Sequence, residues 1–169
     1  MAGTTRDEPR APGEFDRETA RPIAKGRAFE DFEVGQVFEH HWGRTLNAGD
    51  NSLFSAATMH FNPLYFNAEY ARAHGHPDLL INPMLVLSTA VGLSVEDLSE
   101  GGGPFLGVDD LTFHRSVHPG DTLTAVTRIG SIRERAGRTG RLIFTILETK
   151  VTNQRDETVV VERTTLIAR

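Results

Sequence analysis

Apolar and polar residues alternate along the C-terminal half of the chain, with the period of two that is typical of β-strands having one buried face. In residues 123–129, Leu, Ala, Thr and Ile occupy every second position. Two more runs, 142–152 and 158–167, are also predicted to be strands, and an earlier strand is expected over 105–116. Short segments rich in Gly, Asn and Asp between these runs supply turns. The pattern therefore predicts four consecutive strands.

The middle of the chain has the capping residues and spacing of short helices. Asn47, with Asp50 three places later, is typical of a helix N-terminus, and residues 52–59 are compatible with two helical turns. Leu53 and Ala57 share one face of that helix, which we expect to lead toward His60.

Two further helices are expected before the four strands. One spans 68–74 after Asn67, and a longer one begins near Pro83, a favourable first helical residue. The longer helix is predicted to be buried through Leu87, Val91 and Val95, and its small residues Ser88, Ala90 and Gly92 leave room for another group beside it.

One strand over 37–46, a helical block and four strands together predict an α+β fold, with an antiparallel sheet covered by helices on one face. Residues 1–27 are rich in charge, Pro and Gly and have no apolar period, so we expect a mobile tail before a single domain over 28–169.

Composition excludes several classes of function. The 169 residues include no cysteine, which rules out disulfides, thiolate nucleophiles and Cys-ligated zinc. A net charge of -5 without a basic stripe argues against nucleic acid as a partner. No apolar run is long enough for a membrane span, and no secretory signal is visible, so a cytoplasmic protein is expected.

Candidate chemistry lies in His60-Phe61-Asn62-Pro63-Leu64-Tyr65, between the first two helices. An imidazole titrates near neutrality and a phenol near pH 10, so the two ends of this segment suit a base and a proton donor. Two pairs of histidines, at 74 and 76 and at 114 and 118, have no acidic residue or cysteine that would complete a set of metal ligands. Neither a metal site nor a cofactor is therefore expected.

Three stretches make the chain resemble the MaoC-like hydratase/dehydratase family of hot-dog folds, in which a curved antiparallel sheet wraps a long helix. They are Phe29–Gln36, Asn62–Ala71 and Phe113–Leu123 with its Pro-Gly-Asp turn. Residues 82–94 look most like the branch that hydrates branched dicarboxylic enoyl-CoA thioesters of the itaconyl or mesaconyl type. The resemblance also implies a homodimer whose substrate tunnel lies beside the interface.

The family motif runs Asp-x-Asn-Pro-x-His, and its Asp and His share the water that is added. Asn62 and Pro63 match this motif, whereas His60 stands at the Asp position and Tyr65 at the His position. The resemblance also places a Gly N-H on the thioester carbonyl where this chain has Pro83, which has no N-H.

The departures leave three functional hypotheses. The first is a lyase that adds or removes water at an enoyl or 3-hydroxyacyl thioester of CoA or a carrier protein. In it His60 and Tyr65 are catalytic, and the substrate is bound by Asn62, Asn82, Met84 and Ser88. The amide of Met84, the side chain of Asn82 and the hydroxyl of Tyr65 are the candidate replacements for the lost N-H. The second is a repurposed enzyme that cyclises or isomerises a non-thioester substrate, and the third a catalytically silent binding subunit.

Overall fold

A computed structural model describes residues 27, 29–101, 103–137 and 140–168. The strands form one antiparallel sheet in the order β1-β4-β5-β6-β3, with β2 also paired to β4. Their bounds are β1 Val37–Glu39, β2 Arg44–Thr45, β3 Phe105–Phe113, β4 Thr122–Gly137, β5 Gly140–Asn153 and β6 Thr158–Ala168. The four consecutive strands predicted from the alternation are confirmed.

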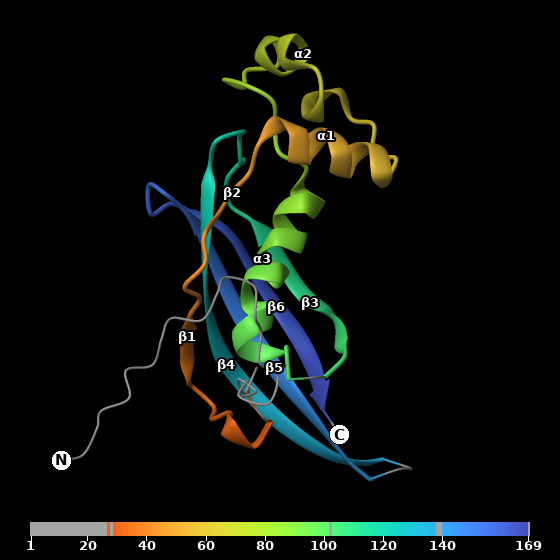
Figure 1. Cartoon of the computed structure of the whole chain (residues 1–169), viewed down its shortest axis with the longest axis vertical. Coiled ribbons are helices and arrows are strands. Elements are labelled where there is room, and N and C mark those ends of the chain that lie inside the picture. The colour runs from red at the N-terminus through yellow and green to blue at the C-terminus, as the bar shows by residue number, and fades with distance from the viewer. Residues whose placement is uncertain (1–26, 28, 102, 138–139, 169) are drawn as a thin grey trace, which may run out of the picture.

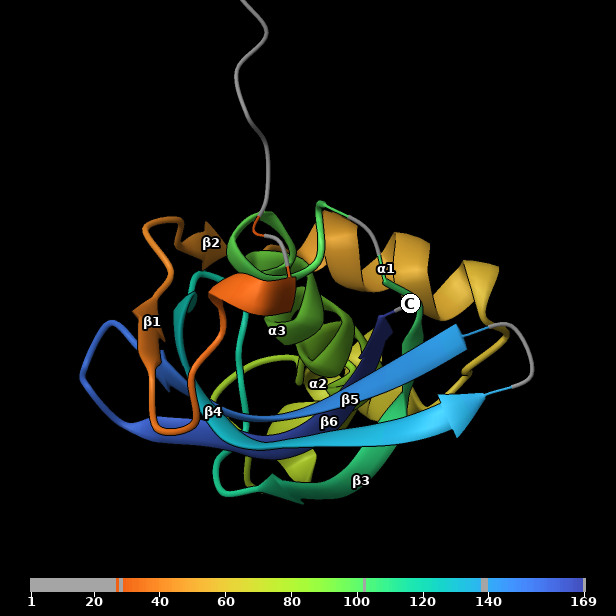
Figure 2. The same cartoon turned by 90° about the horizontal axis from the view of Figure 1, so that it is seen from below.

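The sheet curves around one long helix, α3 (Pro83–Leu98), as seen from below in Figure 2. Residues 123, 125, 127 and 129 of β4 all point to the inner, buried face, as the alternation predicts. Leu123 and Ala125 belong to one core cluster with Val86, Ala90 and Leu93 of α3, and Ile129 belongs to a second cluster with Leu98. The predicted buried face of α3 is wrong: Leu87 and Val91 are only partly buried and Val95 is 40% exposed, whereas the buried positions are Val86, Thr89, Ala90, Leu93 and Leu98.

The shorter helices gather at the N-terminal end of α3 (Figure 1). They are α1 (Ala48–Ala57), the 3-10 turn η2 (Pro63–Tyr65) and α2 (Ala68–Ala73), and a second 3-10 turn, η1 (Phe29–Asp31), precedes β1. The predicted capping residues are confirmed: Asn47 and Asp50 form a reciprocal capping box on α1, and Asn67 caps α2.

Two other local predictions are also wrong. The expected strand over 37–46 is interrupted at residues 40–43, where His40 turns its side chain under α3. Leu53 is 73% exposed, and the buried positions of α1 are the polar Asn51 and Ser55. The predicted tail, 1–27, lies outside the described residues except for Arg27.

A row of polar side chains crosses the inner face of the sheet under the C-terminal half of α3. The Nδ1 of His40 lies 2.7 Å from an oxygen of Asp97, and its Nε2 lies 2.8 Å from the hydroxyl of Thr127. Thr127 in turn hydrogen-bonds Thr149 at 2.9 Å. The next strand places Glu162 directly opposite Thr149, so this row ends in a buried carboxyl group.

Candidate active site

Asn51 joins the three segments that build the site. It is fully buried in α1, where its amide nitrogen donates to the carbonyls of Tyr65 (2.6 Å) and Leu80 (2.8 Å). Its amide oxygen accepts the backbone N-H of Asn82 at 2.7 Å. The contacts span up to 31 positions, so sequence reasoning missed them; the polar residue on the buried face of α1 was the available signal.

Asn82, the N-cap of α3, is the centre of the polar contacts. Its oxygen accepts the Met84 N-H at 3.0 Å, which orients the amide so that its nitrogen faces the other way. That nitrogen lies 3.0 Å from the Nδ1 of His60 and 3.4 Å from the hydroxyl of Ser55. Asn82 has no exposed surface, so these bonds fix it firmly.

The amide of Asn82 also selects the tautomer of His60. Because the amide nitrogen can only donate, Nδ1 accepts the hydrogen bond and the neutral imidazole has its proton on Nε2. The ring of His60 is exposed on its other side. It meets the ring of Tyr65 edge to face, with 5.4 Å between centroids, so the two candidate catalytic residues are adjacent.

Tyr65 is 7% exposed and has its hydroxyl bonded to the side chain of Asn62. The oxygen of Asn62 accepts the Leu64 N-H at 3.1 Å, so the amide nitrogen is the group that donates to the Tyr65 oxygen. Burial raises the pKa of Tyr65 above its ordinary value, against the lowering effect of the Asn62 bond. The hydroxyl therefore keeps its proton at neutral pH and has that proton to donate.

Tyr65 opens on a cavity of about 390 Å³ between η2, the start of α3 and the end of β3. We call it the Tyr65 cavity. Its walls are mainly apolar, and the polar groups among them are Tyr65, His114, Arg115 and Ser116. The lining residues are Leu64, Tyr65, Leu80, Ile81, Pro83, Met84, Val86, Phe113, His114, Arg115, Ser116 and Val117. A small apolar group bearing a polar end fits such a site.

The structure reduces the number of groups that could donate a hydrogen bond to a thioester carbonyl in place of the N-H missing at Pro83. The Met84 N-H is already bonded to Asn82, and both ends of the Asn82 amide are engaged. Of the three candidate donors, the Tyr65 hydroxyl keeps a proton with no partner in the described chain.

Ser88 does not share this site. Its hydroxyl donates to the Met84 carbonyl at 2.8 Å, and it lines a separate groove of about 550 Å³ beside Trp42 and Arg44. The structure thus brings together five of the six predicted site residues and sets Ser88 apart from them. The five are His60, Asn62, Tyr65, Asn82 and Met84.

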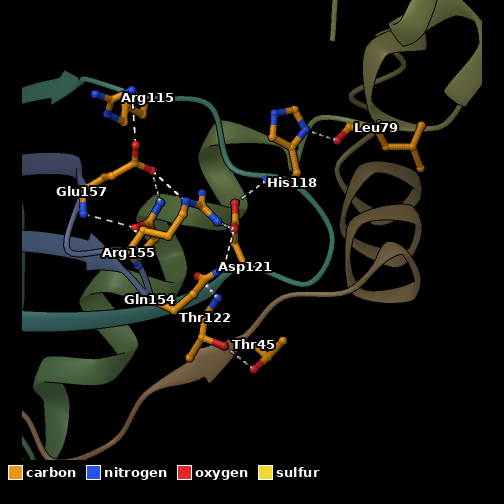
Figure 3. A network of polar contacts seen from close by, with 10 residues as sticks. Thr45, Leu79, Arg115, His118, Asp121, Thr122, Gln154, Arg155 and Glu157 are labelled. Atoms are coloured by element: carbon orange, nitrogen blue, oxygen red, sulfur yellow. Dashed lines mark hydrogen bonds and ion pairs between the residues drawn. The ribbon is translucent and has the colours of Figure 1, made fainter. Parts of the chain in front are cut away.

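The Pro-Gly-Asp turn next to the cavity is held by Asp121 (Figure 3). This buried carboxylate accepts bonds from the His118 N-H (3.0 Å), the Gln154 amide (2.9 Å) and the Arg155 guanidinium (3.0 Å). Burial alone would raise the pKa of Asp121, but these three donors outweigh it and hold the pKa below its ordinary value. The turn is therefore fixed by charge as well as by backbone shape.

Arg115 connects this network to the Tyr65 cavity. One of its terminal nitrogens lies 3.5 Å from Glu157, whose other oxygen is bonded to Arg155 and Asn153. The guanidinium is 58% exposed, so most of its donors remain available to a bound anion.

Within the described ranges, no three His, Cys, Asp or Glu side chains are grouped so that they would hold a metal ion. No helix in that part of the chain is long and apolar enough to cross a membrane.

Comparison with known proteins identifies relatives over most of the chain. A family model described as mesaconyl-CoA hydratase matches residues 12–169. The mesaconyl-CoA hydratase of Haloarcula marismortui is 33% identical over 114 residues, which are 68% of this chain and 32% of that enzyme. This chain thus spans about a third of the length of that curated relative.

Solved structures confirm the fold. A MaoC domain protein of Chloroflexus aurantiacus superimposes with a TM-score of 0.78 at 28% identity, covering 85% of this chain and 40% of that one. Rv0216 of Mycobacterium tuberculosis, described as a double hot-dog fold, superimposes with a TM-score of 0.72 at 26% identity, covering 84% of this chain and 44% of that one. The predicted α+β hot-dog domain, with its sheet around α3, is confirmed.

Proposed function

We propose that this chain, which belongs to the mesaconyl-CoA hydratase family of MaoC-like proteins, adds water to an enoyl-CoA thioester or removes it from the 3-hydroxyacyl product. The main observation in support is the contact between the ring of His60 and Tyr65, the residue that lines the Tyr65 cavity. Two groups able to exchange protons, next to an apolar site of acyl size, are what hydration of a conjugated thioester requires.

Tyr65 serves as the acid. As hydroxide adds to the β-carbon, negative charge develops on the thioester oxygen and the α-carbon, and the phenol donates its proton to the α-carbon. The raised pKa of Tyr65 keeps this proton in place at neutral pH. The Asn62 amide, which donates to the same oxygen, stabilises the phenolate left behind.

His60 serves as the base through Nδ1. In the free protein the lone pair of this nitrogen accepts from Asn82, so the ring is held neutral and oriented. When the exposed ring of His60 turns from the fixed amide of Asn82 toward a substrate water, the same lone pair accepts a proton from that water. The imidazolium then returns a proton to Tyr65 through solvent, which restores both residues for the next turnover.

Arg115 is the proposed receptor for a carboxylate on the acyl group. Among the described residues that line the Tyr65 cavity it is the sole arginine or lysine, and its donors are only partly used by Glu157. The matching family and the Haloarcula relative are both named for mesaconyl-CoA, whose acyl group bears a free carboxylate. We therefore expect a dicarboxylic enoyl-CoA to be preferred over an unsubstituted one.

A second copy of the chain is the proposed partner, paired along β3. This strand forms one edge of the sheet and bonds only to β6 within the described chain. It exposes Phe105 (46%), Leu106 (59%) and Phe113 (39%), an apolar surface that pairing would cover. The double hot-dog of Rv0216 offers a precedent for two such sheets side by side.

The proposal is tested with the purified chain, mesaconyl-CoA and crotonyl-CoA, by loss of enoyl absorbance and the mass of the product. We expect hydration of both, and a fall in kcat of about 100-fold or more in Tyr65→Phe. Tyr70→Phe is the matched control, since the chain has two tyrosines and Tyr70 stacks on His74 at the surface. If the parent converts neither thioester, or Tyr65→Phe keeps the parental rate, this function is excluded.

Substrate preference is tested separately with Arg115→Gln. We expect kcat/KM to fall at least tenfold for mesaconyl-CoA and to change little for crotonyl-CoA, because only the former has a carboxylate to lose its partner. Arg72→Gln, on the surface of α2, is the control. An equal effect on both substrates would contradict the role of Arg115 and leave the hydration itself intact.

A further inference from the structure

Three arginines meet in a groove on the outer face of the sheet, opposite α3. The groove has a volume of about 420 Å³. It is lined by Asp109, Arg133, Arg135, Phe144, Ile146, Arg163 and Thr165, from four different strands. The inner neighbours on β5 are the buried Ile143, Thr145 and Leu147, so Phe144 and Ile146 face outward. We call this site the arginine groove.

The positive charge of the arginine groove is only partly neutralised by the described part of the chain. Arg133 and Arg135 have no carboxylate within ion-pair distance there. Arg163 lies 3.8 Å from one oxygen of Glu148, whose other oxygen is held by Arg128. The chain as a whole has a net charge of -5, so the positive charge of this groove is opposite in sign to the net charge of the protein.

Asp109, the one acidic residue among the described residues that line the groove, already has a hydrogen-bond partner. One of its oxygens accepts the hydroxyl proton of Thr165 at 2.6 Å. Three guanidinium groups that face one carboxylate leave an excess of positive charge. Since like charges in one groove repel, an anion that binds between them gains from all three.

The floor between the arginines is apolar. Phe144 and Ile146 are half-buried side chains of β5, placed between β4 with Arg133 and β6 with Arg163. A ligand that uses both features has at least two negative charges and a flat apolar part. Guanidinium forks match phosphate oxygens, and bases stack on aromatic faces. Nucleotides combine these properties, and a volume of about 420 Å³ is within the range of small-molecule sites.

We propose that the arginine groove binds an adenine nucleotide, with its phosphates held by Arg133, Arg135 and Arg163 and its base on Phe144 and Ile146. Two sources have this chemistry: the nucleotide end of a CoA thioester, and a free nucleotide. The site is defined by residues outside the Tyr65 cavity, so its existence does not depend on the hydration chemistry.

The test is calorimetric titration of the purified chain with ADP, adenosine and inorganic pyrophosphate at low and high salt. We expect ADP to bind with a Kd at or below about 1 mM, pyrophosphate more weakly and adenosine weakest, with binding lost as salt rises. The double variant Arg133→Gln/Arg135→Gln should weaken ADP binding at least tenfold. Arg141→Gln, an exposed arginine paired with Glu134 outside the groove, should not.

Absence of ADP binding up to about 10 mM, or equal binding to parent and double variant, would overturn the proposal. Circular dichroism of each variant shows that the fold is retained. Steady-state kinetics then separate the two sources. If the double variant raises KM for the thioester at unchanged kcat and ADP competes with the thioester, the groove holds the nucleotide end of the substrate. If KM is unchanged while ADP binding is lost, the groove is a separate nucleotide site.

Discussion

Replacement of Glu162 by Gln should stabilise the protein at alkaline pH and not at acidic pH. Glu162 lies on the inner face of β6, is 3% exposed and borders a small cavity of about 90 Å³ under the C-terminal half of α3. One of its oxygens has no hydrogen-bond partner in the described chain. Burial raises the pKa of this carboxyl group to about 7 from an ordinary value of 4.5.

The magnitude follows from the difference between the folded and unfolded pKa values. The folded state binds the proton more tightly, so folding is most stable below pH 4.5 and loses stability as the pH rises to about 7. A difference of this size corresponds to about 3 kcal/mol, which is an upper limit because water can enter the adjoining cavity. Gln has the same shape and no charge, so above pH 7 it should recover about 1 to 3 kcal/mol of unfolding free energy.

The assay is urea unfolding followed by circular dichroism at pH 5 and pH 8. At pH 8, Glu162→Gln should exceed the parent in stability by the amount above, whereas at pH 5 the two should agree to within about 1 kcal/mol. Glu134→Gln, an exposed position on β4, is the control and should show no such trend. An equal difference at both pH values, or a variant less stable than the parent at pH 8, would refute the account of Glu162.

Three more predictions concern the site and its supports. Asn82→Ala should lower the unfolding free energy by about 2 to 4 kcal/mol, because it leaves several buried groups unpaired. Asn67→Ala, which removes a cap at an exposed helix end, is the control and should lower it by about 1 kcal/mol. Equal losses of stability in urea unfolding would contradict this prediction. Asp121→Asn should destabilise the protein at pH 7 in thermal unfolding. The difference in stability should shrink as the pH falls below 3.8, because a carboxylate whose folded pKa is lowered stops stabilising the fold once it is protonated. A difference that persists at lower pH would show that the charge of Asp121 is not the cause. His60→Gln should reduce kcat about 100-fold. It should leave the unfolding free energy within about 0.5 kcal/mol of the parent, because the ring of His60 is exposed. A variant that loses stability and keeps the parental kcat would show that His60 has a structural role.

Local signals in the sequence predicted most of the fold. Asn47, Asn67 and Pro83 marked the helix starts because capping depends on residues only two or three positions away. The alternation in β4 predicted its buried face for the same reason. The prediction that Leu53 lies on the buried face of α1 failed because this helix buries the amide of Asn51 and the hydroxyl of Ser55, which support a polar site. The spacing of apolar residues alone does not reveal such a face.

The candidate site was predicted through resemblance more than through spacing. The hexapeptide identified His60, Asn62 and Tyr65, and the structure places them together. The role of Asn51 and the tautomer of His60 could not be predicted from the sequence, because they depend on contacts between residues 14 to 31 positions apart. The arginine groove was missed for a related reason: its residues come together only through the register of four strands.

The most direct test of the proposed hydration is uptake of oxygen from isotopically labelled water. The purified chain is incubated with mesaconyl-CoA in water enriched in oxygen-18, and the product is analysed by mass spectrometry. We predict one labelled hydroxyl group per product molecule, formed at least about 100-fold more slowly by Tyr65→Phe than by the parent or Tyr70→Phe. A parent that incorporates no label, or a Tyr65→Phe variant that incorporates it at the parental rate, would contradict the assignment of this chemistry to Tyr65.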